Sequence, residues 1–132
     1  MAFQSPAANY AEKRIDFTNL VSLSQNSTYV WECTSDYPAC GILKGSLLAV
    51  DRSLTPKHGN LVIASVDDEL VIRRLLLVPA TALQALTGQC SIIPIKEGNE
   101  SPIWGVIAYA LTDLAGLGFS QIETEALELP DE

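Results

Sequence analysis

The sequence predicts a mainly β domain on three observations. Short β-branched and aromatic runs recur from Thr28 onward, and glycine and proline interrupt them at intervals too short for long helices. No apolar run approaches the roughly 20 residues of a membrane-spanning helix, so no integral membrane protein is expected. Of the 132 residues, 48% are hydrophobic and 18% charged, which excludes a disordered chain and fits one domain of ordinary size.

The expected elements follow in chain order. Residues 1–28 show no core face and predict an extended N-terminal arm. The body, residues 29–111, carries strand-length runs at 29–33, 47–50, 61–66, 70–77, 91–95 and 103–111. Asp67-Asp68-Glu69 is a short acidic connector between the third and fourth runs, and it predicts an antiparallel hairpin.

Residues 112–132 differ from the body and predict an amphipathic helix in an acidic C-terminal extension. From the last residue of the body onward, apolar residues recur at roughly helical spacing, namely Leu111, Leu114, Leu117, Ile122, Ala126 and Leu129. Gly116 and Gly118 each cost about 1 kcal/mol in a helix interior. The helix is therefore expected either to break there or to begin at Ser120, with Glu123 completing a capping box.

The net charge of −8 is unevenly distributed. Residues 112–132 hold six acidic and no basic residues, whereas residues 1–111 hold ten acidic and eight basic ones. The basic residues are scattered, so strong direct DNA binding is not expected. The N-terminus has no charged segment followed by an apolar one, as a secretion signal requires, and this predicts a cytoplasmic protein.

Neither a metal nor a cofactor is expected. The three cysteines, Cys33, Cys40 and Cys90, are odd in number and form no close pair, which predicts reduced, buried thiols rather than a disulfide framework or a zinc site. His58 is the only histidine, and with no ligand cluster around it we expect a turn residue. The acidic connector is too short for a calcium loop.

Four blocks carry a family resemblance. They are SPAANY with EKRID (5–10, 12–16), GI with GSLLAVD (41–42, 45–51), HGNLVIA through VDDE to RRL (58–75), and IWGVI (103–107). In order and spacing they resemble the LexA/UmuD family of self-cleaving peptidases (peptidase S24) of the bacterial DNA-damage response, and within it the processed, amino-terminally shortened form of UmuD. The resemblance implies small, strongly bent antiparallel sheets and, in the UmuD branch, a homodimer.

The family cleaves its own amino-terminal linker with a serine nucleophile and a neutral lysine base. Carried over to this chain, the serine position falls on Tyr37 and the lysine position on Arg73, followed by Arg74. Arginine keeps its proton in proteins, so the general base is lost. Ser35 is a less favoured alternative nucleophile, and Lys44 lies in a turn with no reason to point inward. The family's cleavage dipeptide is also missing before the arm, and we therefore predict a pseudo-peptidase.

Two interpretations of the substituted dyad stay open. Tyr37 and Arg73 either form a new phenol–guanidinium contact or are surface replacements at a site no longer used, and we favour the second because arginine is seldom buried unpaired. Trp31 and Trp104 are expected to be core or dimer-face aromatics.

By resemblance, the function is that of a non-catalytic accessory subunit for translesion synthesis in the SOS response. It would dimerise and bind a UmuC-like Y-family DNA polymerase, with a RecA filament or a full-length UmuD or LexA-like protein as further partners. One alternative is a regulatory decoy that forms mixed dimers with an active UmuD or a LexA-like repressor. Another is a residual serine peptidase acting through Ser35. The C-terminal helix is expected to dock on the dimer or on a partner.

Overall fold

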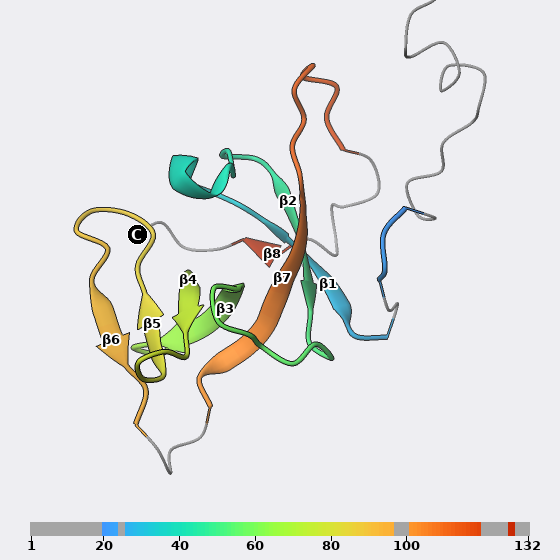
Figure 1. Cartoon of the computed structure of the whole chain (residues 1–132). Helices are drawn as coiled ribbons and strands as arrows, with labels where there is room; N and C mark the ends of the chain where they lie inside the picture. The colour runs from blue at the N-terminus through green and yellow to red at the C-terminus, as the bar shows by residue number, and fades with distance from the viewer. Residues whose placement is uncertain (1–19, 24–25, 97–100, 120–126, 129–132) are drawn as a thin grey trace, which may run out of the picture.

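The computed structural model describes residues 20–23, 26–96, 101–119 and 127–128 (Figure 1). Their regular elements are almost entirely strands, which confirms the mainly β prediction. The elements are β1 (Thr28–Glu32), the 3-10 helix η2 (Pro38–Cys40), β2 (Leu47–Asp51), β3 (Leu61–Val66), β4 (Glu69–Leu76), β5 (Ala82–Gln84), β6 (Ile92–Pro94), β7 (Ile103–Leu111) and β8 (Leu127–Glu128).

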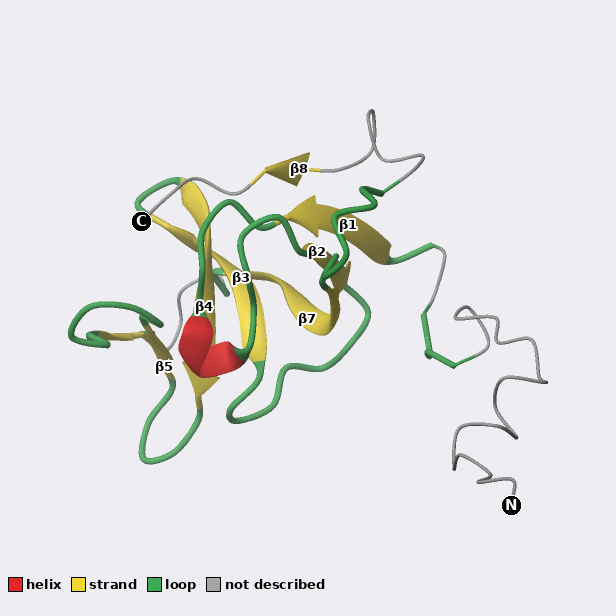
Figure 2. Ribbon diagram, turned by 90° about the horizontal axis from the view of Figure 1, so that it is seen from above, coloured by secondary structure: helices red, strands yellow, loops and turns green. Residues whose placement is uncertain are grey.

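The strands form one continuous sheet in the order β6-β5-β4-β3-β7-β2-β1-β8. The seven strands from β6 to β1 pair antiparallel, and β8 adds to β1 in parallel. The long strand β7 lies between β2 and β3 and joins the two halves of the sheet (Figure 2). Strands β2 and β1 lie on one side of it, and β3 to β6 on the other. The pairing of β7 with β2 shifts register between Ala49 and Val50, and its pairing with β3 shifts between Ile63 and Ala64. Such shifts are typical of β-bulges, which bend a sheet.

Two apolar clusters make up the core. The larger one brings β1 to β4 together with the turn that contains η2, and its buried members are Trp31, Cys33, Tyr37, Ile42, Leu48, Val50, Ile63 and Ile72. The second lies where β3, β4, β5 and β7 meet, and its buried members are Val62, Ala64, Leu75, Leu83 and Val106. Successive side chains of a strand point to opposite faces, so β3 and β4 contribute to both clusters.

The predicted hairpin is confirmed. Strands β3 and β4 pair from Leu61↔Arg74 to Val66↔Glu69, leaving a two-residue turn. Both turn residues, Asp67 and Asp68, have positive φ, 53° and 67°, as a type I′ hairpin turn requires. Aspartate tolerates this conformation better than most residues because its short side chain can hydrogen-bond locally.

The predicted C-terminal helix is wrong for the described residues. Residues 112–119, here named the leucine loop, are irregular, and Leu127–Glu128 is a strand. Gly116 and Gly118 have φ of 75° and 77°, which a right-handed helix does not allow. The Asp113 carboxylate accepts the backbone N–H groups of Gly118, Leu117 and Gly116 and so fixes the loop. A helix start at Ser120 falls outside the described residues.

The described end of the arm is attached to the sheet at two points. The Ser22 backbone N–H donates to the Tyr109 hydroxyl on β7 at 3.2 Å, and the Ser27 hydroxyl donates to the Asp51 carboxylate on β2 at 2.8 Å. Residues 1–19 of the predicted arm lie outside the described residues. None of the helices within the described ranges has the length and apolarity needed to cross a membrane.

Candidate functional site

The turn that follows β1 contains Tyr37, the residue that corresponds to the family's nucleophilic serine. Tyr37 and Ile42 close this turn through two backbone hydrogen bonds, Tyr37 N–H to Ile42 O at 2.8 Å and Ile42 N–H to Tyr37 O at 3.2 Å. Pro38 starts η2 inside it, because proline fits the first position of a helix, and Gly41 ends η2 with φ of 72°. The turn is therefore set by proline, glycine and backbone hydrogen bonds.

Tyr37 is a core residue. Its side chain is only 3% exposed and belongs to the larger apolar cluster, so the interpretation of Tyr37 as a surface replacement is wrong. Its neighbours Asp36 and Pro38 are exposed. Asp36 Oδ1 accepts the Lys44 backbone N–H at 2.6 Å, and this bond holds the two ends of the turn together. The accessible side of the turn thus carries a carboxylate rather than the phenol.

Arg73 and Arg74 lie on opposite faces of β4. Arg74 is on the face of Leu70 and Ile72, which pack with the cluster containing Tyr37, whereas Arg73 is on the face of Val71 and Leu75. Arg74 Nη1 donates to the Gly59 carbonyl at 3.0 Å, and Nη2 lies 3.5 Å from Cys40 Sγ in η2. Arg73 is half-buried, and its Nη1 donates to the Ile72 carbonyl at 2.8 Å.

It is therefore Arg74 that links β4 to the turn through Cys40. Sequence reasoning missed this contact because the family correspondence draws attention to Arg73. The alternation of Leu70, Ile72 and Arg74 along the strand is the signal that could have found it.

The remaining candidates are Ser35 and the lysines. Ser35 is half-buried, and its carbonyl accepts the Cys33 thiol at 3.0 Å. Burial raises the pKa of the Cys33 thiol, which disfavours the reactive thiolate. The lysines within the described ranges, Lys44, Lys57 and Lys96, are all exposed.

The structure shows the surroundings of the three cysteines and of His58. Cys33, Cys40 and Cys90 are all free, as expected, but Cys33 alone is fully buried, while Cys40 is half-buried and Cys90 exposed. His58 Nδ1 accepts the Leu77 backbone N–H at 2.8 Å and so joins the turn before β3 to the end of β4. No group of three or more His, Cys, Asp or Glu side chains able to hold a metal occurs in the described part of the chain.

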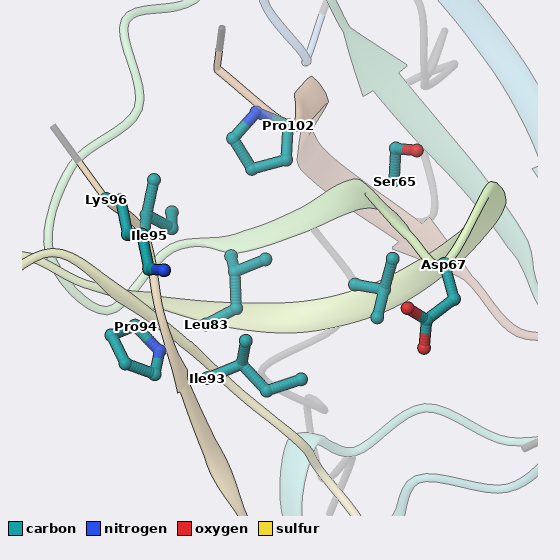
Figure 3. A pocket seen from close by; sticks show the side chains of 9 residues that line it. Ser65, Asp67, Leu83, Ile93, Pro94, Ile95, Lys96 and Pro102 are labelled. Atoms are coloured by element: carbon teal, nitrogen blue, oxygen red, sulfur yellow. The ribbon is translucent and has the colours of Figure 1, made fainter. Parts of the chain in front are cut away.

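The cavity drawn in Figure 3 lies away from these residues. It has a volume of about 390 Å³ and lies between β6 and the start of the β3–β4 turn, with Leu83 and Ile93 in its wall. Asp67 and Lys96 lie on opposite sides of it (Figure 3). Neither Tyr37 nor Arg73 lines it, so the positions carried over from the family do not open into this cavity.

Comparison with known proteins gives one consistent family. The model of the family described as "Peptidase S24-like" matches residues 1–108. The chain is 33% identical to Protein MucA of Salmonella typhimurium over 113 residues, covering 84% of this chain and 77% of that protein. It is 32% identical to Protein ImpA of the same organism, covering 83% and 75%. It is also 33% identical to the LexA repressor of Bordetella pertussis, covering 66% of this chain and 36% of the repressor.

Proposed function

The chain belongs to the Peptidase S24-like family, the LexA/UmuD superfamily, and from that premise we propose that it is a non-catalytic accessory subunit. Like processed UmuD, it forms a homodimer and binds a UmuC-like Y-family DNA polymerase during translesion synthesis in the SOS response. The observation that carries the non-catalytic part of the proposal is the arginine at the position of the family's lysine base.

The chemistry of the base supports this proposal. A serine hydroxyl becomes nucleophilic only when a nearby group removes its proton. A lysine can do so when burial lowers its pKa, whereas the guanidinium of Arg73 stays protonated at any burial. Each lysine of the described ranges is exposed and so lacks the apolar surroundings that this chemistry requires.

The environment of the nucleophile position supports it as well. An attacking oxygen has to meet a peptide carbonyl, yet Tyr37 packs among Trp31, Ile42 and Leu48 in the core. Asp36, the exposed neighbour, is a carboxylate tied to the backbone of Lys44. Neither side chain replaces a serine hydroxyl activated by lysine.

The positive part of the proposal rests on family membership and on the intact scaffold. The antiparallel sheet expected for the family is present from β1 to β7, and this supports a scaffold that can dimerise and bind a polymerase. A scaffold that keeps its fold without its catalytic residues is suited to a binding role.

Co-expression with a UmuC-like polymerase tests the accessory role. The chain should elute with the polymerase in size-exclusion chromatography, at a mass that indicates two copies, and it should not elute with an unrelated polymerase of similar size. A chain that stays monomeric and does not bind the UmuC-like polymerase would contradict the proposal. Mixed dimers with an active UmuD, together with a changed rate of UmuD self-cleavage and no polymerase complex, would replace it with the decoy role.

A further inference from the structure

The half-buried indole of Trp104, on β7, has a guanidinium over its ring. Arg52 follows β2, and its Cζ lies 4.5 Å from the centroid of the Trp104 ring, which is a favourable cation–π arrangement. Arg52 Nε also donates to the Trp104 carbonyl at 2.9 Å, and the Arg52 backbone N–H donates to the Ser27 carbonyl at 2.9 Å. The side chain of Arg52 is therefore held in one place although it is exposed.

The residues around this pair support the same placement. Gly105 has no side chain, and a Cβ there would lie 3.4 Å from Arg52 Cγ, so glycine leaves room for the arginine stem to cross β7. Trp104 packs edge-on against Tyr29 and Trp31, with ring centroids 5.1 and 5.2 Å apart. Because the guanidinium is positioned before any ligand arrives, binding loses less conformational entropy.

The outer end of the guanidinium is available to a ligand. Its Nε is used, but within the described part of the chain its two Nη groups have no hydrogen-bond or ion-pair partner. Asp51, the preceding residue, is buried, and its Oδ1 accepts the hydroxyls of Ser27 and Ser53. The two Nη groups of an arginine form a planar fork that matches the two oxygens of a carboxylate.

A cavity of about 400 Å³ lies beside Arg52 and Trp104. Among the described residues that line it, Arg52 alone is charged. These residues are Arg52, Ser65, Leu70, Ser101, Pro102, Ile103 and Trp104. Glu69 precedes Leu70 on β4 and therefore lies on the opposite face of that strand. The described lining thus offers one cation, two hydroxyls and an apolar wall.

These groups favour a carboxylate that is attached to an apolar segment. A nucleic acid is bound through several cations along its phosphates, whereas the described lining of this cavity has one. Leu70, Pro102 and Ile103 instead fit the apolar neighbours of an acidic side chain in a protein. The negative charge elsewhere on the chain is largely screened beyond about 8 Å at physiological ionic strength, so the cation in the cavity decides which ligand is attracted.

We propose that Arg52 and Trp104 form a docking site for a segment of another protein in which an Asp or Glu side chain stands between apolar residues. The fork of Arg52 binds the carboxylate, and the cavity takes an apolar neighbour. Neither Tyr37 nor Arg73 lines this cavity. The site goes beyond the proposed accessory function, since it requires neither a dimer nor a polymerase.

The probes are two short, end-capped, labelled peptides, one with a single Glu between leucines and the other with Gln in its place. In fluorescence anisotropy at physiological ionic strength, the full chain should bind the Glu peptide about tenfold more tightly, as hydrogen bonds to a charged group imply. Arg52→Gln should abolish this preference, and Arg52→Lys, which keeps the charge without the planar fork, should lose most of it. Lys57→Gln removes an exposed cation at another cavity and should keep the preference.

Four results would overturn the proposal. Equal or undetectable binding of the two peptides would show that the guanidinium does not recognise the carboxylate. A preference that Arg52→Gln retains, or that Lys57→Gln loses equally, would assign the effect to other charges. Stronger binding of a single-stranded oligonucleotide than of the Glu peptide would make a nucleic acid the ligand. Self-association in sedimentation velocity that Arg52→Gln abolishes would make a second copy the occupant. No polymerase takes part, so these outcomes are separate from the test of the accessory role.

Discussion

At the scale of single residues, Asp51 joins the arm, strand β2 and the turn after it. Its Oδ1 accepts the Ser53 hydroxyl at 2.7 Å, the Ser53 backbone N–H at 2.8 Å and the Ser27 hydroxyl at 2.8 Å. The residue is 3% exposed, so these donors replace water around the carboxylate. They hold the pKa of Asp51 below its usual range, with Ser53 contributing more than Ser27.

This arrangement predicts an acid-sensitive contribution to stability. Because the folded pKa is lowered, the contribution is complete above the ordinary aspartate pKa of about 4 and is lost as pH falls through the lowered value. Asp51→Asn keeps the shape but cannot ionise, so its melting temperature should fall less between pH 7 and pH 3 than that of the wild type. Asp67→Asn, at an exposed turn, is the control and should follow the wild type. An identical fall in Asp51→Asn would contradict the assignment.

The proposed loss of the base rests on sequence at this scale, whereas the positions of the side chains required the structure. A guanidinium holds its proton in any fold, so an arginine at the position carried over from the family's lysine supports that proposal. The alternation of Leu70, Ile72 and Arg74 indicates which arginine shares a face with the core, but the contact of Arg74 with Cys40 depends on how η2 packs near β4, which the sequence does not specify. Burial of Tyr37 likewise depends on packing from strands far away in the chain.

At the scale of elements, β7 is the strand on which the sheet depends. It pairs with β2 and β3; Gly105 is opposite Ile63 of β3 and is one residue beyond Val106, which pairs with Asp51 of β2. A Cβ at Gly105 would lie 2.8 Å from Val50 Cγ1 and 3.4 Å from Arg52 Cγ. Val50 is fully buried, so it cannot move aside without disturbing the core.

Gly105→Ala should therefore destabilise the fold by about 1–3 kcal/mol, as overpacking of a dense core does. The measurement is the midpoint of urea unfolding. Ala110→Val adds a larger side chain at the exposed end of the same strand and should change the midpoint little. A neutral Gly105→Ala would show that β7 can shift relative to β2.

Most strands could be predicted because their runs are long and well separated. The hairpin at Asp67–Asp68 follows from its short acidic connector, and β7 from nine residues rich in apolar side chains. Strand β5 was missed, since Ala82–Gln84 is three residues long and has no β-branched side chain. A helix through residues 112–119 is absent because Gly116 and Gly118 adopt positive φ, and apolar spacing alone does not reveal that. The alternative start at Ser120 lies outside the described residues.

At the scale of the whole molecule, the charge changes near the end of β7, whereas the sheet continues beyond it through β8. Strand β7 ends at Leu111, the family match ends at residue 108, and residues 1–111 carry a net charge of only −2. The remaining −6 belongs to residues 112–132. A nearly neutral family domain thus carries an acidic extension whose first part is the leucine loop.

Intact-mass measurement after incubation at alkaline pH tests the central claim most directly. The chain is incubated alone and with a UmuD precursor whose nucleophilic serine has been replaced by alanine, beside an active UmuD as a positive control. Because Arg73 cannot accept a proton, we predict that the masses of the chain and of the precursor stay unchanged while the control is cleaved. A shorter product that disappears with Ser35→Ala would contradict the account and make this chain a peptidase.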